Sequence, residues 1–143
     1  MSGVEVGVGD GPDESARTFL QDRINEFNYD TTGIRDGREL FVIGREGGEI
    51  VGGIYGWTWG GTCDIQYLWV REDRRGAGLG SRLLRAAEEE AERRGCAQVV
   101  VATHSFQAPE FYRRFGYEVT GDVEGYPVGH SHITLRKPLS GGA

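Results

Sequence analysis

A glycine-rich turn between an apolar strand and an amphipathic helix is the feature that most constrains how this chain folds. Residues 74–84 read RRGAGLGSRLL, and they follow the apolar run LWV at 68–70 after a short polar link. The stretch 81–94 is rich in Ala, Glu, Arg and Leu at helical spacing, so it predicts a helix that stops at Gly95. Glycines ahead of a helix leave backbone N–H groups free at its positive end, which favours an anion such as phosphate.

Three phosphate-binding patterns compete for this turn. A P-loop ends in Gly-Lys-Ser/Thr, but here Gly80 is followed by Ser81 and Arg82. A dinucleotide fingerprint requires Gly-x-Gly-x-x-Gly directly after a strand, whereas the residues REDR separate this turn from LWV. The third pattern, Arg/Gln-x-x-Gly-x-Gly/Ala, matches residues 75–80 in sequence and in context. The alternative is a turn whose glycines only let the strand and the helix pack closely.

The remaining elements predict an α+β protein. A strand is expected at 4–8, a helix from Asp10 or Asp13 to about Phe27, and a loop or a broken short helix at 28–39. The other expected elements are three hairpin-connected strands within 39–70, a strand at 97–103, a short helix at 108–115, and strands at 117–122 and 131–139.

Length and composition restrict the class of protein. A chain of 143 residues suits a single domain spanning 1–143. The formal net charge of −6 argues against binding to nucleic acid or an anionic membrane surface and favours a cationic partner. No apolar stretch approaches the roughly 18 residues of a membrane span, and the N-terminus does not resemble a signal peptide. A cytoplasmic protein is therefore expected, with Cys63 and Cys96 as reduced thiols.

The sequence LWVREDRRGAGLGSRLL resembles the acyl-CoA-binding motif of the GNAT N-acetyltransferase superfamily, and the similarity extends over most of the chain. A second stretch, SFQAPEFYRRFGY at 105–117, resembles the family's second signature: an Ala, a Tyr four residues later, then Gly and an aromatic residue. The resemblance implies a mixed, V-shaped sheet flanked by helices. The pantetheine arm of acetyl-CoA would lie where the strand ending at 68–70 splays from the strand at 97–103.

The resemblance also implies which residues hold acetyl-CoA. Backbone groups of Leu68 and Val70 would hold the pantetheine, and the N–H of Val70 would meet the oxyanion. Glycine amides would converge on the pyrophosphate, with added charge from Arg75. Many relatives have Asn where this chain has Ser105, so Gln107 is expected to take over that contact. The predicted acetyl-CoA-binding residues are Leu68, Trp69, Val70, Arg75, Gly76, Ala77, Gly78, Leu79, Gly80, Ser81 and Gln107.

Acetyl transfer to an amine needs an acid for the leaving thiolate, and the resemblance places Tyr112 in that role. A phenol with a pKa near 10 is matched to a thiol near 8 to 9. The alternative is that Tyr112, flanked by Phe111 and Phe115, belongs to the core.

The general base is less defined. Strand alternation predicts that Asp64 shares a face with Leu68 and Val70, and histone-acetyltransferase-like members of the family place a catalytic Glu at that position. Asp64 could instead anchor a cationic substrate or lie at a solvated strand edge, with the proton leaving through water. One of His104, His130 and His132 could also relay the proton. His130-x-His132 lacks a third ligand, so no metal is expected.

Aromatic residues near the acceptor side of this family suggest a pocket for a hydrophobic or cationic amine, although many aromatics simply pack in sheets. The predicted substrate-binding residues are Tyr29, Trp57, Asp64 and Tyr126.

We therefore predict an N-acetyltransferase that moves acetyl from acetyl-CoA to a primary amine by direct attack in a ternary complex. The cysteines lie away from both signatures, so an acyl-cysteine is not expected. The rival hypothesis is a non-catalytic CoA-binding module that acts as a sensor or interaction protein. The acceptor is expected to be a small-molecule or a protein amine, the acyl chain could be longer than acetyl, and a homodimer is possible.

Overall fold

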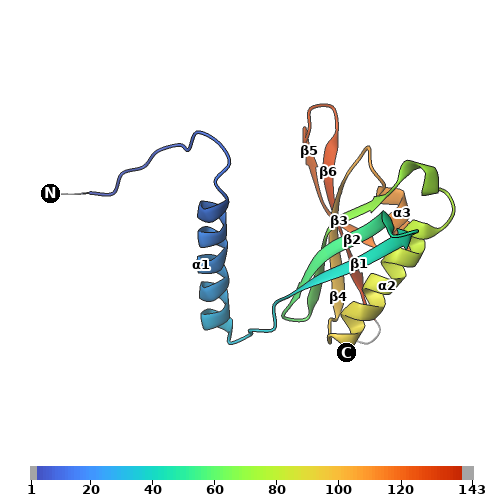
Figure 1. Ribbon diagram of the computed structural model, residues 1–143, viewed down its shortest axis with the longest axis horizontal. Coiled ribbons are helices and arrows are strands. Elements are labelled where there is room, and N and C mark those ends of the chain that lie inside the picture. Colours follow the sequence, from blue (N-terminus) through green and yellow to red (C-terminus); the bar gives the residue numbers. More distant parts are fainter. Residues whose placement is uncertain (1–2, 140–143) are drawn as a thin grey trace. The chain divides into compact units, whose positions relative to one another are not determined.

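The computed structural model describes residues 3–139, and the chain divides into two compact units, Met1–Arg35 and Asp36–Ala143 (Figure 1). The first unit contains one helix, and the second contains the sheet and the remaining helices. That all 143 residues act as one domain stays a prediction.

Helix α1 (Glu14–Thr32) is longer than the sequence suggested. Asp13 caps its start, because the Asp13 carboxylate accepts a hydrogen bond from the Ala16 N–H at 3.0 Å. The helix continues through the polar stretch after Phe27 and ends only at Gly33, where φ reaches 73°. The strand predicted at 4–8 is wrong, since residues 3–13 form no strand and the segment pairs with no other.

The second unit is built on a six-stranded sheet in the order β1-β2-β3-β4-β6-β5. The strands are β1 (Arg38–Glu46), β2 (Glu49–Trp59), β3 (Thr62–Val70), β4 (Gln98–His104), β5 (Glu118–Glu124) and β6 (Ser131–Pro138). The two tight hairpins after β1 and β2 each place two glycines at positive φ, as two-residue turns of type I′ require. Only β3 and β4 are parallel, which confirms the predicted mixed sheet.

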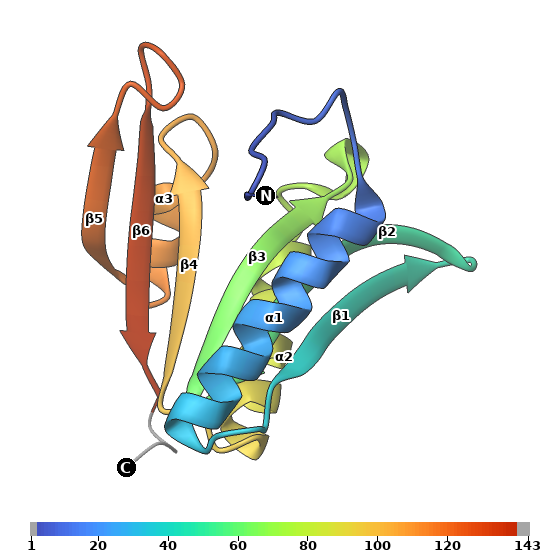
Figure 2. The same cartoon turned by 90° about the vertical axis from the view of Figure 1, so that its left-hand side faces the viewer.

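Strands β3 and β4 pair over a short distance and then separate. Their register joins 62–65 with 98–101 and goes no further, although both strands continue. Figure 2 shows the two strands diverging beyond this point. The V-shaped sheet expected from the resemblance is therefore present, and its opening lies between the carboxyl-terminal halves of β3 and β4.

A β-bulge in β3 changes which side chains share a face. Gly56 pairs with Ile65 while its neighbour Tyr55 pairs with Tyr67, so Gln66 is the extra residue. Because one inserted residue reverses the alternation, Ile65 before the bulge and Leu68 after it both face the core. The prediction that Asp64 shares a face with Leu68 and Val70 is therefore wrong.

Helix α2 (Leu79–Arg93) covers the core face of the first three strands. Its buried residues are Leu83, Leu84, Ala87, Glu88 and Ala91. The helix approaches the sheet closely at Gly52. A Cβ there would lie 3.1 Å from a methyl carbon of Leu79 and 3.1 Å from the Trp69 carbonyl oxygen. The position at which α2 begins therefore depends on the absence of a side chain at Gly52 in β2.

A buried carboxylate ties α2 to the second half of the sheet. Glu88 accepts a hydrogen bond of 2.7 Å from the hydroxyl of Tyr117 and pairs at 3.0 Å with Lys137 of β6. Tyr117 is the aromatic residue that closes the second signature. Since both carboxylate oxygens have partners, the charge of Glu88 is buried without an unsatisfied polar group.

Candidate active site

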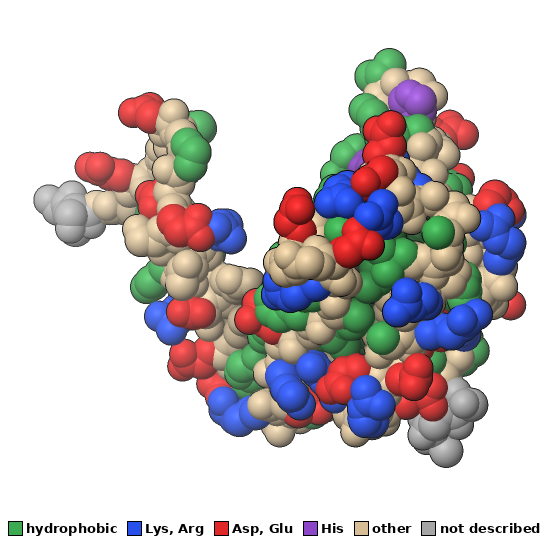
Figure 3. Space-filling model, turned by 45° about the vertical axis from the view of Figure 1, so that its right-hand side comes forward, with side chains coloured by type: hydrophobic (Ala, Val, Ile, Leu, Met, Phe, Trp, Pro, Cys, Tyr) green, Lys and Arg blue, Asp and Glu red, His purple; other side chains and the backbone are tan. Residues whose placement is uncertain are grey.

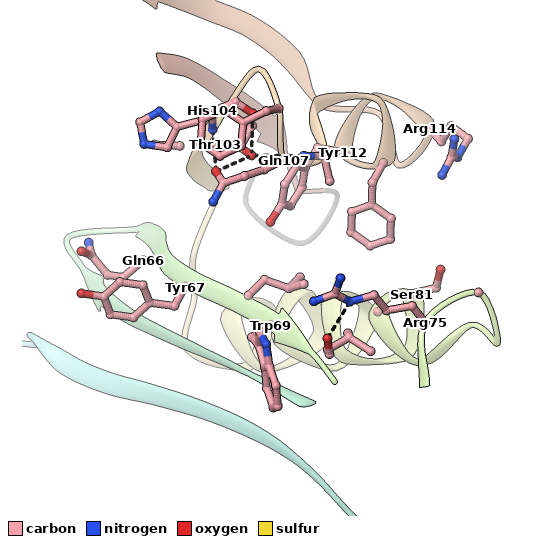
Figure 4. Close-up of a pocket in the computed structure, with 18 of the residues that line it drawn as sticks. Gln66, Tyr67, Trp69, Arg75, Ser81, Thr103, His104, Gln107, Tyr112 and Arg114 are labelled. Carbon is pink, nitrogen blue, oxygen red and sulfur yellow. Dashed lines mark hydrogen bonds between the residues drawn. The ribbon is translucent and has the colours of Figure 1, made fainter. Parts of the chain in front are cut away.

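A cavity of about 1230 Å³ lies along the opening between β3 and β4 (Figure 4). Its walls come from β3, the glycine turn, the start of α2, the end of β4, helix α3 (Pro109–Arg114) and the loop before β6. The predicted site residues that line it are Leu68, Trp69, Val70, Arg75, Gly76, Gly78, Gly80, Ser81, Gln107, Tyr112 and Tyr126.

The glycine turn forms one end of the cavity. Gly78 is the N-cap of α2 with φ at 87°, and no side chain caps the helix. Gly76 also has a positive φ, of 82°, and apart from its immediate surroundings in the chain no atom of residues 3–139 lies within 4 Å of where a Cβ of either glycine would be. The start of α2 therefore presents uncapped backbone N–H groups beside open space, which suits the pyrophosphate of CoA.

Neither the Ala77 nor the Leu79 side chain lines the cavity. Leu79 packs against the core beside Gly52, so only its backbone belongs to the turn.

The arginines of RRGAGLG have different partners. Arg74 pairs with Glu46 of the first hairpin and with Asp73, and Arg71 holds Asp73 at 2.6 Å. Arg75 instead donates from Nε to the Val70 carbonyl at 2.8 Å and lines the cavity. The segment before the glycine turn is thus anchored to β1 by ion pairs. Basic and acidic side chains lie side by side on the face of the second unit in Figure 3.

Along the cavity the backbone edge of β3 pairs with no strand of residues 3–139, and on it the Val70 carbonyl accepts only from the Arg75 side chain. The Arg71 N–H bonds to the Val51 carbonyl of β2 at 2.8 Å. Because backbone groups alternate along a strand, those of Leu68 and Val70 point away from β2, toward the side where β4 has diverged. The Trp69 ring points away from Tyr112, on the other side of β3 (Figure 4).

Tyr112 projects from α3 with its hydroxyl directed toward β3 (Figure 4). Its side chain is only 5% exposed and packs edge-on against Phe111 and Tyr117. Among residues 3–139, no group forms a hydrogen bond with the hydroxyl. Burial raises the pKa of Tyr112 to about 12, so the phenol keeps its proton at neutral pH. The residue is both a core residue and a hydrogen-bond donor at the cavity.

Gln107 lies at the cavity, whereas Ser105 does not. The Gln107 Oε1 accepts from the His104 backbone N–H at 2.6 Å and from the Thr103 hydroxyl at 3.2 Å. Its amide N–H groups are left for other partners. Ser105 accepts a bond from the Ser131 N–H at 2.9 Å, which joins the end of β4 to β6.

Of the other predicted acceptor residues, two belong to the sheet and one belongs to the first unit. Asp64 and Trp57 are opposite one another on β3 and β2, and neither lines the cavity. Asp64 is half-buried, and burial raises the pKa of its carboxyl. Tyr29 belongs to α1 in the first unit, and its role in acceptor binding stays a prediction.

A cluster of rings that sequence reasoning did not assemble closes the other end of the cavity. His104 at the end of β4 is paired in register with His132 of β6, and the loop between β5 and β6 brings Tyr126 beside both. Phe106 stacks on His104, and it also contacts His130. No local sequence pattern signals this cluster, because its residues come from separate segments that meet through the pairing of β4 with β6. In residues 3–139, no group of His, Cys, Asp and Glu could hold a metal ion.

The family model described as "Acetyltransferase (GNAT) family" matches residues 10–117. A blasticidin-S acetyltransferase from Streptomyces morookaense is 43% identical over 97 residues, 64% of this chain and 69% of that protein. An acetyltransferase from Agrobacterium fabrum is 32% identical over 91% of this chain and 96% of its own.

A solved structure has the same fold. An acetyltransferase from Agrobacterium tumefaciens superimposes with a TM-score of 0.88 at 31% identity, covering 95% of this chain and 100% of that one. Among residues 3–139, no helix has the length and apolar character needed to cross a membrane.

Proposed function

The chain belongs to the GNAT acetyltransferase family, and from that premise we propose that it transfers the acetyl group of acetyl-CoA to a small-molecule primary amine by direct attack in a ternary complex. The observation that carries the proposal is the cavity, which joins an uncapped helix start, an unpaired strand edge and the Tyr112 hydroxyl. Acetyl-CoA would supply an acyl group already activated as a thioester.

Two parts of the chain bind the donor. Backbone N–H groups of the glycine turn, from Gly76 to Gly80, bind the pyrophosphate, and the Arg75 guanidinium adds positive charge. Backbone groups of Leu68 and Val70 bind the pantetheine by extending the unpaired edge of β3. The Val70 N–H stabilises the negative charge that develops on the acetyl oxygen.

Tyr112 assists departure of the sulfur. A phenol with a pKa of about 12 is a weaker acid than a thiol, whose pKa is about 8.5, so complete transfer before the C–S bond breaks is unfavourable. Tyr112 therefore donates a hydrogen bond that strengthens as charge builds on the sulfur. Such a group acts mainly in the transition state and affects binding little.

The acceptor occupies the end of the cavity lined by Gln66, Tyr67, Tyr126, His104 and His132. Aromatic faces there favour a planar or cationic amine. Blasticidin S is the first acceptor to test, because a relative that is 43% identical is named for it. With the bulge at Gln66, Asp64 loses the geometric support for its proposed role as base.

The test is an acceptor panel incubated with acetyl-CoA, with release of free thiol as the readout and mass spectrometry to identify the product. We expect thiol release above the rate without acceptor, together with an N-acetylated amine. Binding of acetyl-CoA without turnover of any amine would instead support the non-catalytic module. The relatives are named as acetyltransferases, which favours an enzyme over the non-catalytic module.

A further inference from the structure

We propose that His104 is the proton acceptor for the incoming amine, and that it acts through Nε2 at the acceptor end of the cavity. The inference rests on the proposed acetylation of an amine and goes beyond it by assigning the base.

The hydrogen bonding of His104 fixes its tautomer. Its Nδ1 lies 3.0 Å from the backbone carbonyl oxygen of Tyr126. A carbonyl oxygen can only accept, so Nδ1 carries the hydrogen. In the neutral imidazole Nε2 then has a free lone pair. Among the described residues, no group forms a hydrogen bond with Nε2, so this nitrogen is available to take a proton.

The imidazole is held in place from several sides. Its ring stacks on Phe106 with centroids 5.4 Å apart and planes 10° from parallel. The rings of Tyr126 and His132 each contact it edge-on at 5.1 Å. The His104 backbone N–H donates to Gln107 at 2.6 Å. A base restrained in this way needs little reorganisation when the substrate binds.

The position along the cavity favours the same role. In Figure 4, Arg75, Ser81 and Arg114 lie at one end, Tyr112 lies in the middle, and His104 lies toward the opposite end. If the pyrophosphate occupies the helix start and the sulfur lies at Tyr112, the amine enters on the His104 side. His104 is thus on the correct side of the reacting carbonyl.

The other candidates fit less well. His132 lines the cavity, but no hydrogen bond among the described residues fixes its tautomer. His130 is exposed and does not line the cavity, and neither does Asp64. The titratable groups that face the His104 ring are His132 and Tyr126, with His130 beyond Phe106, and no carboxylate of residues 3–139 bonds to it.

The proton balance of the step is complete. An ammonium R–NH₃⁺ gives one proton to Nε2 of His104, which becomes imidazolium and later releases that proton to solvent. The neutral amine forms the C–N bond as the C–S bond breaks. The nitrogen loses its second proton to solvent, and the departing thiolate, stabilised by the hydrogen bond from Tyr112, takes one proton from solvent. The products are the amide, the free thiol and one released proton.

The test compares His104→Asn with His130→Asn across a range of pH. Asn keeps a side-chain N–H that can donate to the Tyr126 carbonyl but cannot act as a base. His130 belongs to the same ring cluster and lies outside the cavity lining, so its variant is the matched control. The acceptor is blasticidin S or, if another amine of the panel reacts faster, that amine. Calorimetry with acetyl-CoA checks that each variant retains the donor site.

With His104→Asn we expect kcat/KM to fall by about 10²-fold at pH 7 while acetyl-CoA affinity is kept. The deficit should shrink as the pH rises toward the pKa of the amine, because the substrate then arrives already neutral. His130→Asn should follow the wild type. Equal activity of His104→Asn and wild type, or a deficit that does not change with pH, would overturn the assignment. Absence of turnover by the wild type with every amine would overturn the proposed acetylation itself.

Discussion

Gly78 combines an unusual backbone conformation with a place in the proposed pyrophosphate site, and a substitution with a matched control tests which of the two matters. Its φ of 87° disfavours any other residue, and its N–H belongs to the proposed pyrophosphate site. We expect Gly78→Val to weaken acetyl-CoA binding by about 1 to 3 kcal/mol, the scale of charge-assisted hydrogen bonds, as measured by calorimetry. Gly95→Val is the matched control, because Gly95 has a φ of 81° with open space around it at the other end of α2. Equal losses of affinity in both variants would mean that strain, and not the site, is responsible.

Tyr112 packs in the core and is also the proposed hydrogen-bond donor to the departing sulfur. The substitution Tyr112→Phe keeps the ring and removes the hydroxyl. Since the hydroxyl has no partner among the described residues, the free energy of unfolding near neutral pH should change little. We expect kcat to fall by about 10²- to 10³-fold with nearly unchanged acetyl-CoA affinity, measured by steady-state kinetics and calorimetry. When the acyl donor carries a more acidic thiol, the Tyr112→Phe substitution should reduce turnover by a smaller factor. Wild-type turnover by the variant would leave Tyr112 as a core residue only.

At the scale of elements, close packing of α2 on β2 sets where the glycine turn lies. Gly52→Ala would place a Cβ 3.1 Å from Leu79 and 3.2 Å from Leu83. We expect it to destabilise the fold by about 1 to 3 kcal/mol in denaturant unfolding and to weaken acetyl-CoA binding by displacing the start of α2. In Gly44→Ala the new Cβ would lie 3.4 Å or more from the same leucines, so the loss of stability should be smaller. Similar losses of stability in Gly52→Ala and Gly44→Ala would show that α2 shifts easily to make room for the added Cβ.

The elements also show what sequence can and cannot predict. The glycine turn and α2 were predictable because their spacing directly reflects local backbone requirements, whereas the second signature was identified by its resemblance to the GNAT family. The bulge at Gln66 was not, since Ile65, Gln66 and Tyr67 all suit a regular strand and only pairing with β2 reveals the extra residue. The contact between His104 and Tyr126 likewise depends on how β4 and β6 pair.

For the whole molecule, burial of protonated groups predicts loss of stability at alkaline pH. The folded-state pKa of Tyr112 is raised to about 12 from its usual value near 10. This contribution is fully present below pH 10 and is lost as the pH rises through 12, because the unfolded chain ionises first. Tyr117 should act in the same direction, since burial and its bond to Glu88 raise its pKa.

We expect the free energy of unfolding to fall between pH 10 and 12 by about 1.4 kcal/mol per pH unit for each such tyrosine. Denaturant unfolding at several pH values measures this slope. Tyr112→Phe should reduce the slope by one tyrosine's share, while substitution of the exposed Tyr67 by Phe serves as the control. A slope that Tyr112→Phe leaves unchanged would mean that the hydroxyl is hydrated in the folded protein.

The catalytic cycle is a property of the whole molecule, because donor and acceptor must occupy one cavity together. Cys63 and Cys96 are buried, and burial raises the pKa of Cys63 to about 12, so neither thiol suits an acyl-enzyme. The most direct measurement is initial-velocity kinetics with acetyl-CoA and the amine both varied. Direct attack in a ternary complex predicts double-reciprocal lines that intersect. Parallel lines, the pattern of a ping-pong reaction through a covalent intermediate, would contradict it.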